Sequence, residues 1–517
     1  MNNTSNKNGP VILVSKDILY TFPFGYAYLA GYLIDRNEEV KILYQPKKMV
    51  DFREFARKLI QIKPLMVGFG TLYPDLYVVR EIIKCLNEEG RDFPVVIGGQ
   101  MVTPTPKFAM EITGADIGVI GEGEIILYEI VQALRKGQDI KNVRGVIVKK
   151  DNEMILTGQG DYIKDMSKLP LVPYHLFPTD KWLNIGQFYV SYSQPHWLYN
   201  DRVIAIHGGR GCPFRCNFCY HHNLPRYRTV ASMFEGLDRL LEKYNANMLY
   251  FGDDLVLMSP IRAKELVQSI KKLKRKISYS VSCRFDILDR LDDETLIEMK
   301  RTGCRIMGLG IESGSQRILN IIDKRITVEQ IKKGMRRLKM AGILPTVSIM
   351  VGQYTETLDD VQKSIDLMLE TLRYDKNINF AFTITTPFPG TKLYDIALES
   401  GLLKNHLDFY KKFNPTTDIS GLSVNLSAMS DEEVIRMRNR LEEIYQQEKK
   451  RLVGKKVTVV EWFRYFIFRV YRKLDKTIIK KLPDKHIFNL VKYIYHQGHN
   501  LIQLGLDKIR LYFLDIK

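Results

Sequence analysis

Three of the six cysteines in the chain, Cys212, Cys216 and Cys219, fall within eight residues and directly follow a short β-rich run. A Cys-x3-Cys-x2-Cys spacing supplies one ligand too few for a closed four-coordinate metal site. Three thiolates on a cubane iron–sulfur cluster instead leave one iron free to bind something else. The spacing therefore favours a [4Fe-4S] cluster with an open iron, built on a loop that follows a strand.

Two other interpretations of these cysteines are weaker. His221 or His222 could complete a zinc site, but zinc sites are usually built from two separated ligand pairs, and the chain has no second pair. Disulfides are disfavoured because the N-terminal residues contain no apolar signal segment, so we expect a reducing, cytoplasmic location. Cys85, Cys283 and Cys304 lie apart in the sequence and are expected to be buried apolar residues.

The 517 residues are too many for one ordinary core, and a content of 45% hydrophobic and 26% charged residues is typical of a folded protein with two or three domains. No stretch offers the roughly 18 uninterrupted apolar residues that a membrane span requires. The formal net charge is +18, and residues 451–517 alone hold 15 Lys and Arg against 5 Asp and Glu. The excess of positive charge is thus concentrated at the C-terminal end.

Residues 10–150 alternate β-rich runs with helical patterns, which predicts a doubly wound, Rossmann-like domain with helices on both faces of a parallel sheet. A ligand of such a sheet binds at the carboxyl ends of its strands. The loops there contain Thr71, Gly98 and Gly99, which we take as the candidate contacts. No Gly-x-Gly-x-x-Gly opens the first helix, which argues against a dinucleotide. The predicted strands are Val11–Val14, Glu39–Leu43, Leu65–Phe69, Pro94–Ile97 and Ile117–Ile120.

Three segments of this domain, Gly25–Leu33, Ile97–Gly99 and Ile120–Glu124, resemble the cobalamin-binding domain of the cobalamin-dependent radical SAM family. The resemblance implies cobalamin as a cofactor. The Asp-x-His-x-x-Gly loop by which some cobalamin proteins supply a histidine ligand is absent after Val14. The alternative is a Rossmann-like domain that binds another ligand or none.

Residues 151–200 are predicted to be a linker, since Pro170, Pro173 and Pro178 impose extended or turn geometry. Strand and helix alternation resumes over residues 201–400, where six strands predict a partial (β/α)6 barrel. The cysteine loop follows the first of these strands and should lie at the carboxyl-terminal mouth. The strands are Val203–Ile206, Met248–Phe251, Ser278–Ser282, Ile306–Gly310, Thr346–Met350 and Asn379–Ile384.

This second domain resembles the radical SAM core, and the resemblance implies a cofactor role for several residues. Gly252, Asp253 and Asp254 stand where the family binds the amino group of S-adenosylmethionine (SAM). Arg284 could pair with the SAM carboxylate and Glu312 with the ribose hydroxyls, while Phe218 could contact the adenine. Taken singly, Glu312, Arg284 and the two aspartates could equally be a helix-terminal charge, a surface ion pair and a helix cap.

Two later segments extend the resemblance to the radical SAM core. Gly352–Thr357 stands where the family usually has Gly-Leu-Pro-Gly-Glu-Thr, but Tyr354 and Thr355 replace the Pro and the second Gly. The sequence therefore does not predict the backbone geometry of this loop. Thr386–Tyr394 matches the family's closing Thr-Pro-x-Pro-Gly-Thr turn.

Residues 401–517 are predicted to form a helical, basic extension, with one helix running from Asp431 to about Leu452 after the cap Ser430. The segment Trp462–Lys473 combines basic and aromatic residues. It is either an amphipathic helix that covers the barrel or a peripheral membrane contact within residues 455–517. No nucleic-acid-binding motif accompanies the charge, so nucleic acid is not expected as a partner.

The resemblance implies an enzyme that cleaves SAM reductively to a 5′-deoxyadenosyl radical and modifies an unactivated carbon. Cobalamin-dependent C-methylation is the first expectation and radical cyclisation or rearrangement the second, followed by a radical SAM enzyme without cobalamin. A non-catalytic sensor that binds the cluster and SAM is the alternative from another class. The expected partners are a small-molecule or lipid substrate and a one-electron donor of the flavodoxin or ferredoxin type.

Overall fold

The computed structural model describes residues 6–16, 22–46, 51–150, 153–180, 182–183, 201–220, 225–413 and 421–453. The chain forms two units, Met1–Tyr445 and Gln446–Lys517, and both large β-sheets lie in the first. Of the second unit only the end of one helix is described. His221, His222, residues 184–200 and the proposed membrane segment within residues 455–517 lie outside the described residues.

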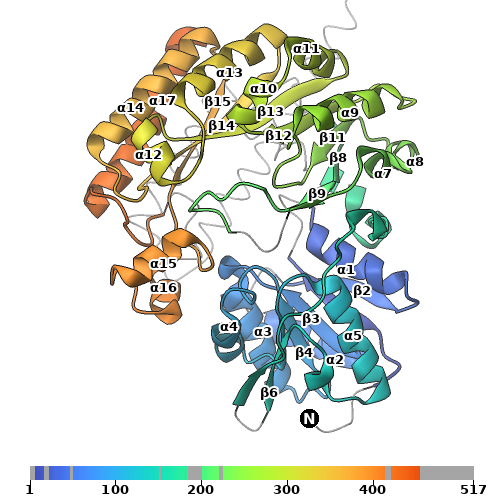
Figure 1. Cartoon of the computed structure of the whole chain (residues 1–517). Helices are drawn as coiled ribbons and strands as arrows, with labels where there is room; N and C mark the ends of the chain where they lie inside the picture. The colour runs from blue at the N-terminus through green and yellow to red at the C-terminus, as the bar shows by residue number, and fades with distance from the viewer. Residues whose placement is uncertain are drawn as a thin grey trace, which may run out of the picture. The chain divides into compact units, whose positions relative to one another are not determined.

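The first sheet has seven strands in the order β2-β1-β3-β4-β5-β6-β7 (Figure 1). Strands β1 to β5 are parallel, as the sequence predicts, and each begins or ends within two residues of its predicted bounds. The antiparallel hairpin β6-β7 extends the sheet beyond β5 and is not predicted by the sequence. The strands are β1 Val11–Ser15, β2 Val40–Tyr44, β3 Met66–Gly70, β4 Val95–Gly98, β5 Ile117–Val119, β6 Val146–Lys150 and β7 Glu153–Leu156.

Helices cover both faces of this sheet, which confirms the doubly wound architecture. All five residues of β1 are buried, as expected for a central parallel strand with apolar neighbours on both faces. One face packs on α2, α3 and α4, the other on α1 and α5, in two separate apolar cores (Figure 1). The helices are α1 Phe24–Ile34, α2 Phe52–Ile62, α3 Leu76–Glu88, α4 Pro106–Thr113 and α5 Gly123–Lys136.

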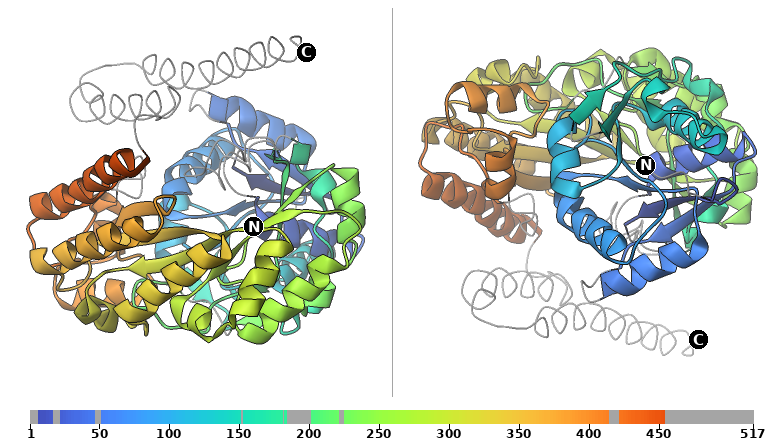
Figure 2. Two further views of the ribbon diagram at one scale, coloured as in Figure 1. Left: turned by 90° about the horizontal axis from the view of Figure 1, so that it is seen from above. Right: turned by 90° about the horizontal axis from the view of Figure 1, so that it is seen from below.

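The second sheet has six parallel strands in chain order, β8-β11-β12-β13-β14-β15, which confirms the predicted (β/α)6 arrangement. The connecting helices lie along one side of it (Figure 2). Its strands are β8 Val203–Ile206, β11 Met248–Phe251, β12 Ser278–Cys283, β13 Cys304–Glu312, β14 Leu344–Val351 and β15 Asn379–Ile384. Its helices are α7 Val230–Phe234, α8 Leu237–Lys243, α9 Pro260–Lys271, α10 Phe285–Arg290, α11 Asp293–Arg301, α12 Gln316–Ile321, α13 Val328–Ala341 and α14 Leu358–Tyr374.

The chain after the barrel returns to the first domain. Helices α15 (Lys392–Glu399) and α16 (His406–Lys412) contribute Leu393, Tyr394 and Phe409 to the same apolar core as α2, α3 and α4. The ring of Tyr73, which follows β3, meets the ring of Phe409 edge to face with centroids 5.3 Å apart. This shared core ties the barrel's last segment to the first sheet.

Helix α17 runs over Asp431–Val453, which confirms the predicted helix after residue 430. Ser430 caps it: its Oγ accepts from the Glu433 amide at 3.2 Å, and Glu433 accepts from the Ser430 amide at 2.9 Å. Within the described residues, none of the helices has the length and apolarity that crossing a membrane requires. Cys283 and Cys304 are buried as expected, but Cys85 is only partly buried, because it lies at the edge of the core.

Candidate functional site

The cysteine loop leaves the carboxyl end of β8, as predicted, and a two-stranded ribbon brackets it. Strand β9 (Gly209–Arg210) precedes the cysteines and pairs antiparallel with β10 (Arg226–Tyr227), which follows them. Cys216 is buried, Cys212 is half-buried and Cys219 is the most exposed. The Cys219 amide donates to the Cys216 carbonyl at 3.0 Å, which turns the loop tightly between the second and third cysteine.

The three thiols fit the predicted cluster. Burial raises the pKa of Cys212 and raises that of Cys219 to about 12, and the negative charge of a neighbouring Cys216 thiolate adds to both effects. The sulfur atoms thus lie within electrostatic reach of one another, and bound iron would replace their protons. In the described part of the chain no three His, Cys, Asp or Glu side chains converge on a single ion. A cluster does not need that convergence, since each thiolate binds a different iron.

Arg284, expected to pair with the SAM carboxylate, contacts the cysteine loop. It follows β12, its side chain is buried, and its Nη1 lies 3.6 Å from Cys216 Sγ. Its Nε donates to Asp286 Oδ1 at 2.9 Å, and its guanidinium carbon lies 3.5 Å from the centre of the Phe214 ring. The guanidinium therefore lies against the second cysteine of the loop. The contact with SAM stays a prediction.

Gly252, Asp253 and Asp254 follow β11 and hold the start of the cysteine loop. Both carboxylate oxygens of Asp253 accept from the Gly208 amide, at 2.9 and 3.1 Å, and burial raises the pKa of Asp253 to about 7. Asp254 Oδ2 accepts from the Gly211 amide at 2.9 Å. The two aspartates therefore shape the loop backbone through charge-assisted hydrogen bonds. Their contact with the SAM amino group stays a prediction.

Glu312 ends β13 in the left-handed backbone region, with φ of 64°, which is unusual for a residue with a side chain and is typical of functional sites. Its buried carboxylate accepts from Lys324 Nζ at 2.8 Å and from Ser348 Oγ at 2.9 Å. Ser348 is on the neighbouring strand β14. The carboxylate is thus fixed at the mouth of the barrel, where the ribose contact is predicted.

Lys324 is a site residue that the sequence reasoning missed. Its side chain is buried, and its Nζ lies 5.7 Å from the centre of the Phe218 ring. Burial raises the pKa of Cys219, and the positive charge of Lys324 partly opposes that rise. In the sequence, Lys324 stands out only as a lysine between Asp323 and Arg325. In the structure, both of these neighbours have a positive φ. The predicted adenine contact Phe218 is half-buried and packs on the core shared with α15.

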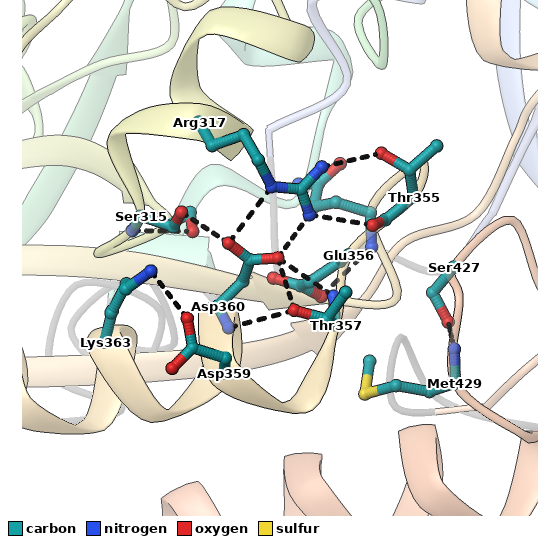
Figure 3. Close-up of polar contacts among 12 residues, drawn as sticks. Ser315, Arg317, Thr355, Glu356, Thr357, Asp359, Asp360, Lys363, Ser427 and Met429 are labelled. Carbon is teal, nitrogen blue, oxygen red and sulfur yellow. Dashed lines mark hydrogen bonds and ion pairs between the residues drawn. The ribbon is translucent and has the colours of Figure 1, made fainter.

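The loop after β14 keeps a left-handed position despite its altered sequence. Thr355, which replaces the family's second glycine, has φ of 60°. Arg317 holds it there by donating from Nη2 to its carbonyl oxygen at 2.8 Å and from Nη1 to its Oγ1 at 3.2 Å (Figure 3). Glu356 closes the loop by accepting from the Gly352 amide at 2.7 Å, and burial raises its pKa to about 8.

In the first domain, the segments that follow β3 and β4 approach each other closely at the carboxyl edge of the sheet. The residues involved are Thr71, Gly98 and Gly99. Thr71 Oγ1 donates to the Gly98 carbonyl at 2.9 Å. Gly99 has φ of 105°, and a Cβ built on it would lie 2.9 Å from the Thr71 carbonyl oxygen. A Cβ on Gly121, in the loop after β5, would meet no atom within 4 Å. The small residues at this edge let a large flat group approach the backbone, which fits a corrin, and the three predicted contacts stay predictions.

Tyr26 is a second residue that sequence reasoning missed. The strand order reverses between β1 and β3, where doubly wound domains bind their ligands. Tyr26 spans that point, because its hydroxyl donates to the Val14 carbonyl at 2.7 Å and accepts from the Gly70 amide at 2.6 Å. Burial raises the pKa of Tyr26 above its usual range.

Aromatic side chains of α1 reach the barrel at the end of β8. The Phe24 ring centroid lies 5.0 Å from that of His207, and the Tyr28 hydroxyl donates to the His207 carbonyl at 3.4 Å. A Cβ on Gly252 would lie 2.6 Å from Phe24 Cε2, so only glycine allows this approach. Burial lowers the pKa of His207 to about 3, which keeps the imidazole neutral.

Comparison with known proteins matches both domains to families. Residues 206–368 match the radical SAM superfamily and residues 10–131 match the B12 binding domain. An uncharacterised methyltransferase of Pyrococcus horikoshii is 31% identical over 391 residues, which cover 74% of this chain and 79% of the relative. The anaerobic magnesium-protoporphyrin IX monomethyl ester cyclase of Rubrivivax gelatinosus is 24% identical over 409 residues, covering 77% of this chain and 69% of the relative.

Among solved structures, the radical S-adenosylmethionine methyltransferase TsrM of Kitasatospora setae, determined with cobalamin and a [4Fe-4S] cluster bound, has a similar fold. The TM-score is 0.60 at 20% identity, over 76% of this chain and 75% of TsrM. These matches confirm the predicted family, the α/β architecture and the cofactor set of cluster, SAM and cobalamin. The chain belongs to the radical SAM superfamily of enzymes, in the group whose radical SAM domain follows an N-terminal B12-binding domain.

Proposed function

We propose that this radical SAM enzyme transfers a methyl group to an unactivated carbon with the help of cobalamin. The observation that carries the proposal is the contact between the two cofactor regions. Arg210, two residues before Cys212, binds Glu122 at the carboxyl edge of the first sheet at 2.8 Å. The loop for the cluster and the edge for the corrin are therefore in direct contact.

When bound, the cluster and SAM supply a radical that abstracts hydrogen from carbon, and cobalamin supplies the methyl group. The chain's own residues position and shield these groups. Cys212, Cys216 and Cys219 would hold the cluster, and Arg284 contacts this loop through Cys216 Sγ and the Phe214 ring. Glu312, fixed by Lys324 and Ser348, offers a prearranged acceptor whose orientation is set before SAM binds, which is the condition for accurate positioning.

Radical cyclisation is the second candidate, and the observation in its favour is the similarity to the Rubrivivax cyclase over 77% of this chain. The same pair of domains serves both reactions, so fold alone does not separate them. A labelled methyl group does. SAM carrying a deuterated methyl group should yield a product about 17 mass units heavier than the substrate under methylation, because CD3 replaces one hydrogen, whereas cyclisation leaves the product without the label.

Anaerobic reconstitution with iron, sulfide, hydroxocobalamin and dithionite tests the proposal. We expect about four irons per chain, one retained corrin, and release of 5′-deoxyadenosine from SAM, measured by mass spectrometry. Cys216→Ala should abolish both iron retention and release of 5′-deoxyadenosine. Cys85→Ala, a free cysteine of the first domain, is the matched control and should change neither.

Two results would overturn the proposal in different ways. A reconstituted chain that holds iron and SAM but never releases 5′-deoxyadenosine would be a non-catalytic sensor. A chain that releases 5′-deoxyadenosine but never retains cobalamin would be a radical SAM enzyme of another kind.

The substrate we propose is a small molecule or a lipid, and the electron donor is of the flavodoxin or ferredoxin type. Incubating the reconstituted enzyme with methyl-labelled SAM and separate polar and lipid extracts would assign the substrate class. The peripheral membrane contact through residues 455–517 stays a prediction. Flotation with anionic liposomes, before and after truncation at residue 453, tests it. Equal flotation of the two chains would show that residues 455–517 make no membrane contact.

A further inference from the structure

Two arginines face each other at the base of the cysteine loop. Arg210 in β9 is directly opposite Arg226 in β10, so one positive charge lies on each side of the loop that carries the cysteines. Like charges directly opposite on antiparallel strands destabilise the pairing. The ribbon therefore needs negative charge from elsewhere to stay closed.

The first domain supplies that charge through Glu122, in the loop after β5, and Glu124, in the first turn of α5. Arg210 Nη1 lies 2.8 Å from Glu122 Oε2 and 3.1 Å from Glu124 Oε2, and its Nη2 contacts the other Glu124 oxygen. Arg226 Nη1 lies 3.2 Å from Glu122 Oε2, and its Nη2 contacts the other Glu122 oxygen. Both arginines thus make forked contacts with carboxylates, the strongest geometry for such pairs.

The four side chains are largely removed from water. Their exposed fractions are 18% and 11% for Arg210 and Arg226 and 12% and 4% for Glu122 and Glu124. The charge of Glu124 outweighs burial and raises the pKa of Arg210 above its usual range. Removing one partner of such a cluster leaves a buried, uncompensated charge, so each member depends strongly on the others.

A second contact fixes the far end of the cysteine loop. Tyr220, directly after Cys219, hydrogen-bonds Thr103 of the first domain. Its ring fills the space over Gly390, where a Cβ would lie 2.4 Å from Tyr220 Cε2 and 3.0 Å from Pro104 Cβ. The first domain therefore touches the loop on both sides of the cysteines.

We propose that Glu122 and Glu124 are positioning residues for the iron–sulfur cluster, because they close the ribbon that holds the three cysteines. The cluster loop is then ordered only while the B12-binding domain is docked on it. This inference rests on the proposed function for the presence of the cluster. It goes further in giving the first domain a role in cluster retention as well as in cobalamin binding.

Glu38 provides a matched control in the same domain. It is as buried as Glu124, pairs with Arg135 and accepts from Gln132 at 2.8 Å, but it precedes β2 at the opposite, amino edge of the sheet. Glu38→Gln should lower the melting temperature, because it too removes a buried charge from an ion pair, without reaching the cysteine loop. A loss that is specific to the cluster is thereby separated from general destabilisation.

The experiment compares full-length wild type, Glu122→Gln/Glu124→Gln, Arg226→Gln and Glu38→Gln. After reconstitution we expect at least fivefold less iron and sulfide in the first two variants, and altered g-values in the electron paramagnetic resonance spectrum of any cluster that remains. Glu38→Gln should match wild type in both. In the iron-free chains, amide hydrogen exchange of β9 and β10 should rise at least tenfold in the ribbon variants alone.

Wild-type iron content, g-values and ribbon protection in Glu122→Gln/Glu124→Gln would overturn the inference. The same holds if Glu38→Gln loses iron to the same extent. Should the double variant fail to fold, Arg226→Gln decides by the same measurements, since it leaves Glu124 paired with Arg210. A wild type that retains no iron would contradict the proposed function instead, and hydrogen exchange in the iron-free chains would still test the closing of the ribbon.

Discussion

Lys324 Nζ and Glu312 Oε1 are 2.8 Å apart, and each side chain is only 8% exposed. A buried ion pair contributes little net stability by itself, but a single buried charge left without its partner is costly. The lysine and the glutamate are therefore interdependent. The lysine lies near Cys219 and the glutamate is hydrogen-bonded to Ser348, so the pair belongs to the candidate site at the mouth of the barrel.

Lys324→Met should lower the free energy of unfolding by about 3–5 kcal/mol, because Glu312 stays buried without its cation. The double variant Lys324→Met/Glu312→Gln removes both charges and should lose less than Lys324→Met alone. Urea unfolding of the iron-free chains measures the free energy of unfolding of both variants. A double variant as unstable as the sum of the two single variants would show that the residues do not interact.

Thr355→Gly should relieve the left-handed strain that Arg317 now holds in place (Figure 3). A non-glycine residue in that region costs roughly 1–2 kcal/mol, and glycine gives back part of this in the unfolded chain. Thr355→Ala is the matched control, because it loses the same hydroxyl contact but keeps the strain. We expect the glycine variant to be about 1 kcal/mol more stable than the alanine variant in urea unfolding, and equal stabilities would contradict a strained loop.

The sequence predicts the parallel strands well for a physical reason. Most of the eleven predicted strands are short, largely apolar runs between a turn and a helical pattern, so local periodicity determines them. The family's glycines and acidic residues also follow strand ends, which places them at one edge. The second strand of the hairpin, Glu153–Leu156, escapes this reasoning because none of its residues is buried. The first strand contains the buried apolar residues Val146–Val148 but was not predicted either.

What the sequence cannot predict are the contacts between residues far apart in the chain. Arg210 and Glu122 are 88 residues apart, and no local pattern pairs them. Asp253 and Arg284 were placed at the right strand ends, but their partners in this structure are the cysteine loop itself. Such partners depend on the packing of two domains, which periodicity does not encode.

Gly252→Ala should weaken the contact between α1 and the barrel, because the new Cβ would lie 2.6 Å from Phe24 Cε2. Overpacking of this kind typically costs about 1–3 kcal/mol. Gly25→Ala is the control, since its Cβ would meet no atom within 4 Å and alanine favours the first turn of α1 by about 0.5–1 kcal/mol. The melting temperature should fall in Gly252→Ala and rise in Gly25→Ala. Adding Phe24→Leu to Gly252→Ala should partly restore its melting temperature.

His207 should make the stability of the protein depend on pH below neutrality. Its pKa is lowered to about 3 by burial, and the positive charges of Arg210 and Arg228 add to this effect against the opposing charge of Glu122. The unfolded chain binds a proton near pH 6.5, so it binds more protons than the folded chain between pH 6.5 and 3. The stability due to a neutral His207 is therefore complete above pH 6.5 and is lost as the pH falls.

When the pH falls from 7 to 5, His207 alone should lower the free energy of unfolding by about 2 kcal/mol. His207→Phe keeps an aromatic ring between Phe24 and Tyr28 but removes the titration. Urea unfolding of both chains at the two pH values gives the contribution of His207 as the difference between their losses, because all other groups titrate alike. Equal losses in wild type and variant would mean that the imidazole is protonated in the folded protein or reaches water there.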